Sequence, residues 1–272
     1  MIIGFLGAGK MARALAVGVV RGGVASANDL LFTTRSVASG EPFRQLFPQG
    51  NPHWLADHTQ LVHESDLIVL AIKPQGFAEA LPALREVSAG KLFLSLAAGV
   101  TLAKMEGWLH PTARVIRSMP NTPMQLGVGA SVYAGGAAVT AADFALVERI
   151  LTSAGKAWRV EEGQIDAITA LSGSGPAYVF HFIEALTLAG VGLGLEIDFA
   201  RDLAIQTVYG SAKLAAESPL PPMELAAQVK SPRGTTLAGC AVLEEGDALN
   251  RLMAGCLAAA KARAEAMARG ET

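Results

Sequence analysis

A glycine-rich turn near the start of the chain constrains the fold more than any other feature. Residues 2–6 read Ile-Ile-Gly-Phe-Leu, an apolar run typical of a buried strand, and the turn Gly7-Ala8-Gly9-Lys10-Met11-Ala12 follows at once. Gly7 permits the tight turn, Gly9 lets a pyrophosphate approach the backbone, and Ala12 lets the following helix pack close to the strand. Strand, turn and helix in this order predict an α/β domain that binds a dinucleotide. The alternative is the same fold without a cofactor.

The residues after the second predicted strand indicate which dinucleotide is bound. That strand covers residues 30–33, and sites that prefer NAD usually place an acidic residue near its end, bonded to the ribose 2′-hydroxyl. Here Thr34, Arg35 and Ser36 follow instead. A guanidinium can hold a phosphate through two parallel hydrogen bonds, so the pattern favours NADPH, with NADH as the alternative. The simpler interpretation of Arg35 is a solvated loop residue.

Further apolar runs predict the rest of a doubly wound sheet, over residues 66–72, 92–96, 115–119, 128–134 and 157–160, with a helix at 141–153. In such sheets, ligands bind beyond the carboxyl ends of the strands. Ala71, Lys73 and Pro74 stand at one of these ends and are candidate cofactor contacts, although a lysine facing solvent is the simpler interpretation of Lys73. A stiff loop, Pro120-Asn121-Thr122-Pro123, follows Met119 at another strand end.

Composition narrows the classes of function. The chain has 272 residues, which suits about two domains, and its formal net charge of −2 without a long basic run disfavours nucleic-acid binding. Cys240 and Cys256 have no histidines at metal-ligand spacing, so we expect no metal site. No apolar run is long enough to cross a bilayer, and the first residues lack the basic start of a signal peptide. We therefore expect a cytoplasmic protein.

The pattern changes to long helical periods after residues 161–163. We expect a dinucleotide-binding domain over residues 1–161 and an all-helical domain over residues 162–272. A loop is predicted at residues 171–175, where Ser174 is a candidate cap for a helix that starts near Pro176. That helix is apolar nearly all round, which is typical of a buried helix. A domain of about 110 residues cannot easily bury it, so we expect subunits to associate through it. The alternative is packing across its own cofactor domain.

A second polar loop lies near the end of the chain, at Ser231-Pro232-Arg233-Gly234-Thr235-Thr236. Its glycine can adopt backbone angles that other residues avoid. Thr235 and Thr236 stand where a new helix would expose unpaired N–H groups, and such groups make a natural seat for a carboxylate. The simpler interpretation is a helix N-cap with a proline turn.

Five motifs, in one order and spacing, resemble a known enzyme family, pyrroline-5-carboxylate reductase. They are Gly7 to Ala12, Ala71 to Pro74, Arg117 to Pro123, Leu171 to Ala177 and Ser231 to Thr236. The first is generic, the last three are specific to this family and its near relatives, and the resemblance covers nearly the whole chain. It implies reduction of a cyclic imine, pyrroline-5-carboxylate, to L-proline with NADPH or NADH. It also implies a Rossmann-type cofactor domain and a helical domain that forms an interlocked homodimer, five of which can assemble into a ring, a decamer.

The same resemblance implies roles for individual residues. Thr236 would be the catalytic residue, hydrogen-bonded to the ring nitrogen, and the backbone N–H groups of Gly234, Thr235 and Thr236 would hold the substrate carboxylate with help from Ser231. The other implied contacts are Ser174, Gly175 and Pro176 on a second wall of the substrate site, and Met119, Pro120 and Asn121 near the nicotinamide. None of these motifs assigns a catalytic role to a histidine or a cysteine, which argues against a dehydrogenase that uses a histidine base.

One residue departs from the family pattern. Arg233 stands where the family has the first of two glycines. We expect this position to accept ordinary backbone angles, because arginine at a positive φ would cost about 1–2 kcal/mol. The side chain of Arg233 then either points to solvent or lends charge to the substrate carboxylate.

Two other functions compete with this one. A hydroxyacid dehydrogenase of the 6-phosphogluconate type also joins a Rossmann-type domain to helices. It would use a lysine in the first helix of the second domain, and the sequence between Pro176 and Ala200 contains none. A non-catalytic NADPH-binding module would explain the glycine turn but would give no function to residues 231–236.

Overall fold

The computed structural model describes residues 1–271, which fold into two compact units. The first unit contains the chain up to Ser174 together with the final residues from Ala260 on, and the second contains Gly175–Ala259. Each unit has its own architecture, and the two are described separately.

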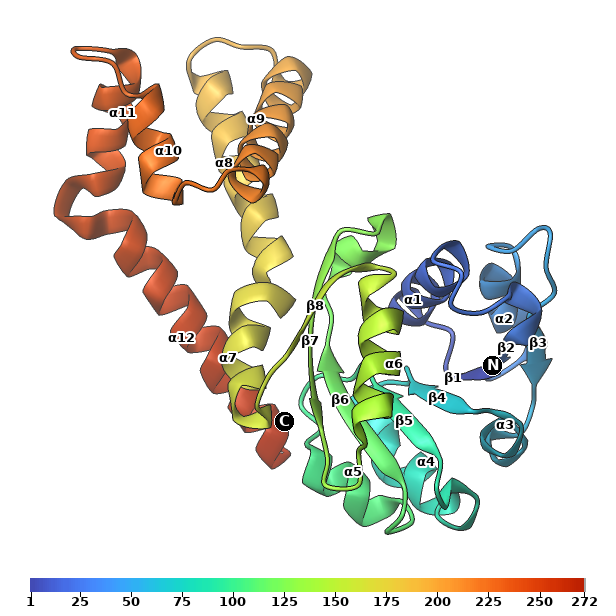
Figure 1. Ribbon diagram of the computed structural model, residues 1–272. Coiled ribbons are helices and arrows are strands. Elements are labelled where there is room, and N and C mark those ends of the chain that lie inside the picture. The colour runs from blue at the N-terminus through green and yellow to red at the C-terminus, as the bar shows by residue number, and fades with distance from the viewer. Residues whose placement is uncertain (272) are drawn as a thin grey trace. The chain divides into compact units, whose positions relative to one another are not determined.

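The first unit is built on one eight-stranded sheet with the strand order β3-β2-β1-β4-β5-β6-β7-β8 (Figure 1). Neighbouring strands run parallel, except that β6 and β7 are antiparallel. This sheet confirms the predicted Rossmann-type, doubly wound fold. The strands are β1 (Ile3–Leu6), β2 (Leu30–Thr33), β3 (His53–Leu55), β4 (Leu67–Leu70), β5 (Leu92–Ser95), β6 (Arg114–Met119), β7 (Gly129–Gly135) and β8 (Gly155–Arg159).

Helices cover both faces of the sheet and enclose two apolar cores. Successive residues of a strand point to opposite faces, so Phe5 and Phe32 enter one core while Leu6 and Leu31 enter the other. Burial on both faces explains why these strands are nearly continuous apolar runs. Residues of α1 (Lys10–Arg21), α2 (Val37–Arg44) and α6 (Ala141–Thr152) pack in the first core, and residues of α3 (His58–Glu64), α4 (Phe77–Ala83) and α5 (Leu102–Trp108) in the second.

The first unit extends past residue 162, and the domain division expected there stays a prediction. The segment that follows β8 stays attached to the sheet, because the side-chain amide of Asn121 donates to the carbonyl of Ser172 at 3.1 Å. The end of the chain returns to the same unit, where the ammonium of Lys104 donates to the carbonyl of Ala268 at 2.6 Å. These tertiary bonds join residues far apart in the sequence, and helical periodicity alone does not report them.

The segment that leads out of the first unit is helical, so the loop predicted at residues 171–175 is wrong. It begins with α7 (Ile165–Ile168) and continues as a π-helical turn over Thr169–Gly173. Ser174 has right-handed helical angles, with φ −86° and ψ −20°, and so cannot be the extended residue that an N-cap requires. Of the small residues that favoured a loop, Gly173 instead lies close to the side chain of Met119 at the end of β6, as described below.

The second unit consists of helices with little core of their own. The first two helices of this unit, α8 and α9, have only small side chains buried, those of Thr187, Ala200 and Ala204. Large apolar side chains stay in solvent: Phe180 of α8 is 64% exposed and Leu252 of α12 is 69% exposed. The single chain therefore does not bury its apolar helix, in line with the expectation that a domain of this size would need a second subunit to cover it. Within residues 1–271, each helix is too short or too polar to span a membrane. The helices of this half are α8 (Gly175–Gly192), α9 (Ile197–Glu217), α10 (Pro222–Val229), α11 (Thr235–Glu244) and α12 (Ala248–Arg269).

Candidate active site

The glycine turn has the geometry that a bound pyrophosphate needs. Gly7 has φ +100°, and a Cβ at this position would lie 2.9 Å from the backbone of Ala71, so only glycine fits. A Cβ on Gly9 would meet no atom within 4 Å, which leaves open space beside its backbone. Gly9 O accepts the first helical bond of α1, so the N–H groups of Lys10 and Met11 precede the ladder and are free to face an anion. The turn therefore fits a dinucleotide phosphate.

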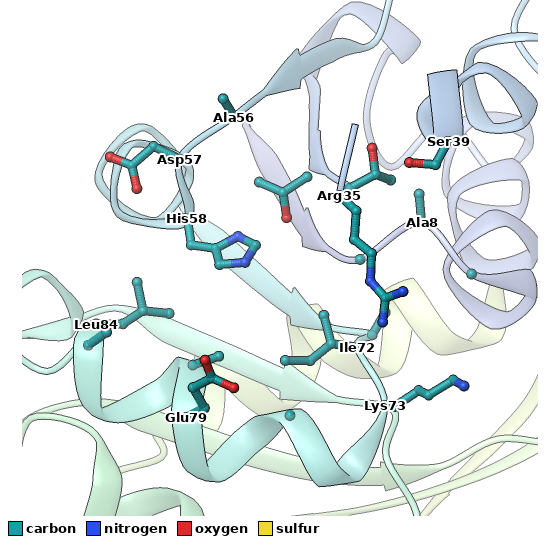
Figure 2. Close-up of a pocket in the computed structure, with 18 of the residues that line it drawn as sticks. Ala8, Arg35, Ser39, Ala56, Asp57, His58, Ile72, Lys73, Glu79 and Leu84 are labelled. Atoms are coloured by element: carbon teal, nitrogen blue, oxygen red, sulfur yellow. The ribbon is translucent and has the colours of Figure 1, made fainter. Parts of the chain in front are cut away.

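A pocket of about 1130 Å³ opens at the carboxyl ends of β1, β2, β3 and β4 (Figure 2). It brings together seven of the residues singled out in the sequence: Gly7, Ala8, Gly9, Thr34, Arg35, Ala71 and Lys73. Four others, Lys10, Met11, Ser36 and Pro74, are neighbours of these residues in the chain but do not line the pocket. Asn121, which follows β6, does not line it either. Met119 and Pro120, at the end of β6, are likewise outside this pocket.

The hydroxyl groups after β2 are engaged within the protein. Thr34 Oγ1 donates to the carbonyl of Ser36 at 2.7 Å and accepts from the indole of Trp54 at 3.0 Å. The hydroxyls of Ser36 and Ser39 form a reciprocal cap at the start of α2. Arg35, in contrast, is exposed and makes no ion pair among residues 1–271. Of the three residues predicted to select the cofactor, Arg35 thus has the free donors.

The sequence analysis missed the wall of the pocket that follows β3. This wall consists of Ala56, Asp57, His58 and Thr59. Strand β3 is short and partly exposed, so it has no apolar run to mark it. One signal was available: Asp57 precedes α3 and accepts a hydrogen bond from the N–H of Thr59 at 2.8 Å, a helix N-cap pattern readable from sequence.

Asn121 links the end of β6 to the π-helical turn. Its amide donates to Ser172 O at 3.1 Å, and its Oδ1 accepts from the N–H of Ala130 at 2.8 Å. Beside it, a Cβ on Gly173 would lie 2.4 Å from Met119 Cε, so the turn can approach Met119 only because residue 173 is glycine. The Asn121 side chain therefore joins the π-helical turn, through its amide nitrogen, to β7, through its Oδ1.

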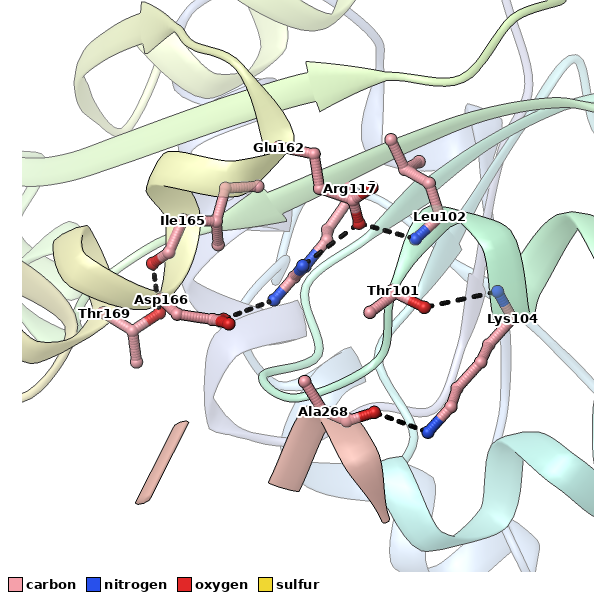
Figure 3. Close-up of polar contacts among 9 residues, drawn as sticks. All are labelled: Thr101, Leu102, Lys104, Arg117, Glu162, Ile165, Asp166, Thr169 and Ala268. Carbon is pink, nitrogen blue, oxygen red and sulfur yellow. Dashed lines mark hydrogen bonds and ion pairs between the residues drawn. The ribbon is translucent and has the colours of Figure 1, made fainter. Parts of the chain in front are cut away.

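Arg117, on β6, forms a buried ionic cluster with two carboxylates (Figure 3). Its side chain is 3% exposed and pairs with Glu162 and Asp166, each at 3.1 Å. Glu162 also accepts the N–H of Leu102 at the start of α5, at 2.7 Å. One arginine thus joins β6, α5 and the segment that leads to the π-helical turn.

The hydroxyl loop of the second unit ends at α11. The N–H of Gly234 donates to Ser231 O at 2.9 Å, so it is not available to a ligand as the sequence analysis expected. A Cβ at residue 234 would lie 2.2 Å from Ser231 Oγ, which explains the glycine. The N–H groups of Thr235 and Thr236 precede the helical ladder of α11, and the side chain of Thr236 makes no hydrogen bond to another of residues 1–271. Two backbone donors and one hydroxyl without a partner among residues 1–271 therefore lie at this helix start.

Arg233 has φ +58°, so the expectation of ordinary backbone angles at this residue is wrong. The loop keeps the left-handed turn that the family's glycine would adopt without strain, and arginine is held in it at a cost of about 1–2 kcal/mol. The Arg233 side chain is exposed in the single chain, in keeping with the first of the two positions considered for it.

We predict that Arg233→Gly stabilises the protein by about 0.5–1 kcal/mol, because the strain relieved exceeds the added freedom of glycine in the unfolded chain. Thermal unfolding monitored by circular dichroism would measure this. Arg233→Ala is the matched control, because it removes the guanidinium but keeps the strained Cβ. Equal stabilisation by both substitutions would show that charge, and not backbone strain, is responsible.

A Rossmann-type sheet, a glycine turn open to a phosphate and a free arginine beside it define the class of protein: a dinucleotide-binding protein with a helical second region. Comparison with known families narrows this class. Residues 162–267 match the family model described as pyrroline-5-carboxylate reductase dimerisation, and residues 2–99 match that of NADP oxidoreductase, coenzyme F420-dependent.

Individual relatives agree with these matches. The chain is 40% identical over 260 residues to pyrroline-5-carboxylate reductase of Arabidopsis thaliana, a match that covers 95% of this chain and 93% of that protein. It is 39% identical to the enzyme of Methanosarcina acetivorans, over 89% of both chains. The solved reductase structure from Coxiella burnetii has a TM-score of 0.90 at 36% identity and 97% coverage of both chains. The reductase of Plasmodium falciparum, solved with NADP bound, has a TM-score of 0.86 at 29% identity and 98% coverage of both.

The chain belongs to the pyrroline-5-carboxylate reductase family, and its helical half is the dimerisation region of that family. Membership sets aside both the hydroxyacid dehydrogenase and the non-catalytic module as interpretations of the sequence.

Proposed function

We propose that the protein reduces pyrroline-5-carboxylate to L-proline with NADPH, the last step of proline synthesis. The observation that carries the proposal is the start of α11, where a chain of this family has the N–H groups of Thr235 and Thr236 ahead of the helical ladder and the Thr236 hydroxyl without an internal partner among residues 1–271. A carboxylate and a ring nitrogen on one small molecule match these donors.

The reaction needs orientation more than it needs a strong acid. A protonated cyclic imine is already electrophilic, so a hydride added to its carbon sends the C=N electron pair to nitrogen and leaves a secondary amine. NADPH supplies that hydride. The N–H groups of Thr235 and Thr236 hold the substrate carboxylate, and Thr236 Oγ1 hydrogen-bonds the nitrogen. Fixing the reacting atoms in this way can contribute several kcal/mol to the rate, on the order of what oriented intramolecular reactions gain.

Other residues shape the two binding regions. The N-terminus of α1, with Gly7, Ala8, Gly9, Lys10 and Met11, holds the pyrophosphate of the cofactor. Ala71, Lys73 and Pro74 border it, and Met119, Pro120 and the backbone of Asn121 lie along the nicotinamide. Ser174, Gly175, Pro176 and Ser231 complete the walls around the substrate.

A coupled assay tests the activity directly. Purified protein should consume NADPH when pyrroline-5-carboxylate is added, and the product should be identified as proline. Absence of turnover with both NADPH and NADH would overturn the proposal. The six-membered cyclic imine, assayed in parallel, would show how strictly the site selects ring size.

We predict that Arg35→Ala raises the Kd of NADPH about tenfold or more and that of NADH less than about twofold, because charge-assisted bonds contribute about 1.5–3 kcal/mol each. Fluorescence titration of each nucleotide without substrate would measure both constants. Arg35→Lys, which keeps the charge but loses the planar fork, should fall between wild type and alanine. Equal losses for both nucleotides would refute a role at the 2′-phosphate.

We also propose that the subunits form a homodimer through the helical half and that dimers assemble further, into a decamer. The exposed apolar side chains of this half, among them Phe180 and Leu252, support the dimer. Light scattering would give the mass in solution, and a stable monomer would contradict both statements. The cytoplasmic location expected from the sequence stays a prediction.

A further inference from the structure

The topology of the sheet brings a histidine next to Arg35. Strand β3 pairs in parallel with β2, with Leu55 opposite Thr33, so the segments that follow the two strands leave the same edge side by side. Arg35 comes two residues after β2, and His58 comes three residues after β3. Figure 2 shows both side chains pointing into the pocket from different walls. This corner lies on the β2 side of the glycine turn, where a Rossmann-type site holds the adenosine ribose.

The His58 ring has unused hydrogen-bonding groups. Nδ1 is buried and has no partner among residues 1–271, and Nε2 makes no hydrogen bond there either. Burial lowers the pKa of His58, and the charge of Asp57 opposes this only in part. The free protein therefore presents a neutral imidazole whose one N–H is a donor.

Several other polar groups at this corner are already engaged or carry the wrong charge, whereas the hydroxyl of Thr33, which also lines the pocket, is buried without a partner among residues 1–271. The hydroxyls of Thr34, Ser36 and Ser39 bond within the protein. Asp57 caps α3, and Glu79 lies on α4 across the pocket. An anion at the ribose 2′-position would thus find N–H donors on Arg35 and His58, with the Thr33 hydroxyl at the end of β2 and Lys73 farther along at the end of β4.

We propose that His58 is a second determinant of selectivity for NADP over NAD, donating its Nε2–H to the 2′-phosphate that Arg35 binds from the other wall. The inference rests on the proposed use of NADPH and adds to it a residue of this chain. The His58 residue is also partly buried, so the contact of its ring with the ligand and the packing of the ring must be separated by experiment.

Binding measurements separate the two roles of the ring. His58→Phe keeps the ring volume but removes both nitrogens, and His58→Gln places an amide N–H near the position of Nε2. The probes are NADPH against NADH, and adenosine 2′,5′-bisphosphate against AMP, which report on the adenosine end alone. We expect His58→Phe to raise the Kd of both 2′-phosphorylated ligands about tenfold and that of the other two less than about twofold. His58→Gln should restore the phosphorylated ligands to within about threefold of wild type.

The controls make each outcome decisive. His63→Phe changes an exposed histidine of the same helix outside the pocket and should leave all four constants unchanged. Equal losses for phosphorylated and unphosphorylated ligands would assign His58 to packing, and unchanged constants in His58→Phe would also overturn the inference. If wild type itself does not prefer the 2′-phosphorylated ligands, the use of NADPH fails. Reduction of pyrroline-5-carboxylate, measured separately with NADH, tests the reaction independently.

Discussion

Thr236→Ala is expected to lower kcat about 100-fold while the Kd of NADPH stays within about twofold of wild type. In the proposed function, the substitution removes the hydroxyl that hydrogen-bonds the ring nitrogen, and loss of one such preorganised polar group commonly costs this much in rate. The backbone N–H groups of residues 235 and 236 are retained, so substrate still binds. Steady-state kinetics with saturating NADPH, together with nucleotide titration, would measure both quantities.

Neighbouring substitutions provide the controls. Thr236→Ser keeps the hydroxyl and should recover activity to within about tenfold of wild type. Thr235→Ala removes an equivalent hydroxyl one residue earlier, at the first position of α11, and should have a smaller effect than Thr236→Ala. If alanine at 235 and alanine at 236 reduced kcat equally, the hydroxyls would act through the helix start and not through the substrate nitrogen.

The sequence predicted those parts of the molecule whose cause is local. The turn at Gly7 requires a positive φ and a close approach to Ala71, and both requirements leave a readable glycine. Strands β1, β2 and β4 are buried on both faces, so their apolar runs are unambiguous. The same logic located the hydroxyl loop at the start of α11.

Other parts depend on contacts that local patterns do not record. Gly173 reads as a loop residue, yet it serves to let a helical turn approach Met119. The pocket wall at His58 was missed because β3 has only three residues and lies at the sheet edge. The left-handed backbone of Arg233 was not expected, because the residue type argues against it and only the turn between Ser231 and Gly234 requires it.

Arg117→Met should destabilise the protein by about 3 kcal/mol, because removing one partner of a buried ionic cluster typically costs about 3–5 kcal/mol. The value falls at the low end of that range since Glu162 and Asp166 are 32% and 22% exposed and can regain some hydration. The two carboxylates would also be left facing each other without a counterion. For a chain of this size, the loss corresponds to a fall in Tm of about 6–12 °C, which differential scanning calorimetry would detect.

Two further variants show whether the cluster itself is responsible. Arg149→Met removes an exposed arginine of α6 and should change stability by less than about 0.5 kcal/mol. Adding Glu162→Gln and Asp166→Asn to Arg117→Met removes the unpaired charges and should recover part of the loss, because neutral amides at these positions do not repel each other. If Arg117→Met cost no more than Arg149→Met, the cluster would not be what holds the segment after β8 to the sheet, and the position of the π-helical turn would have to depend on Asn121 instead.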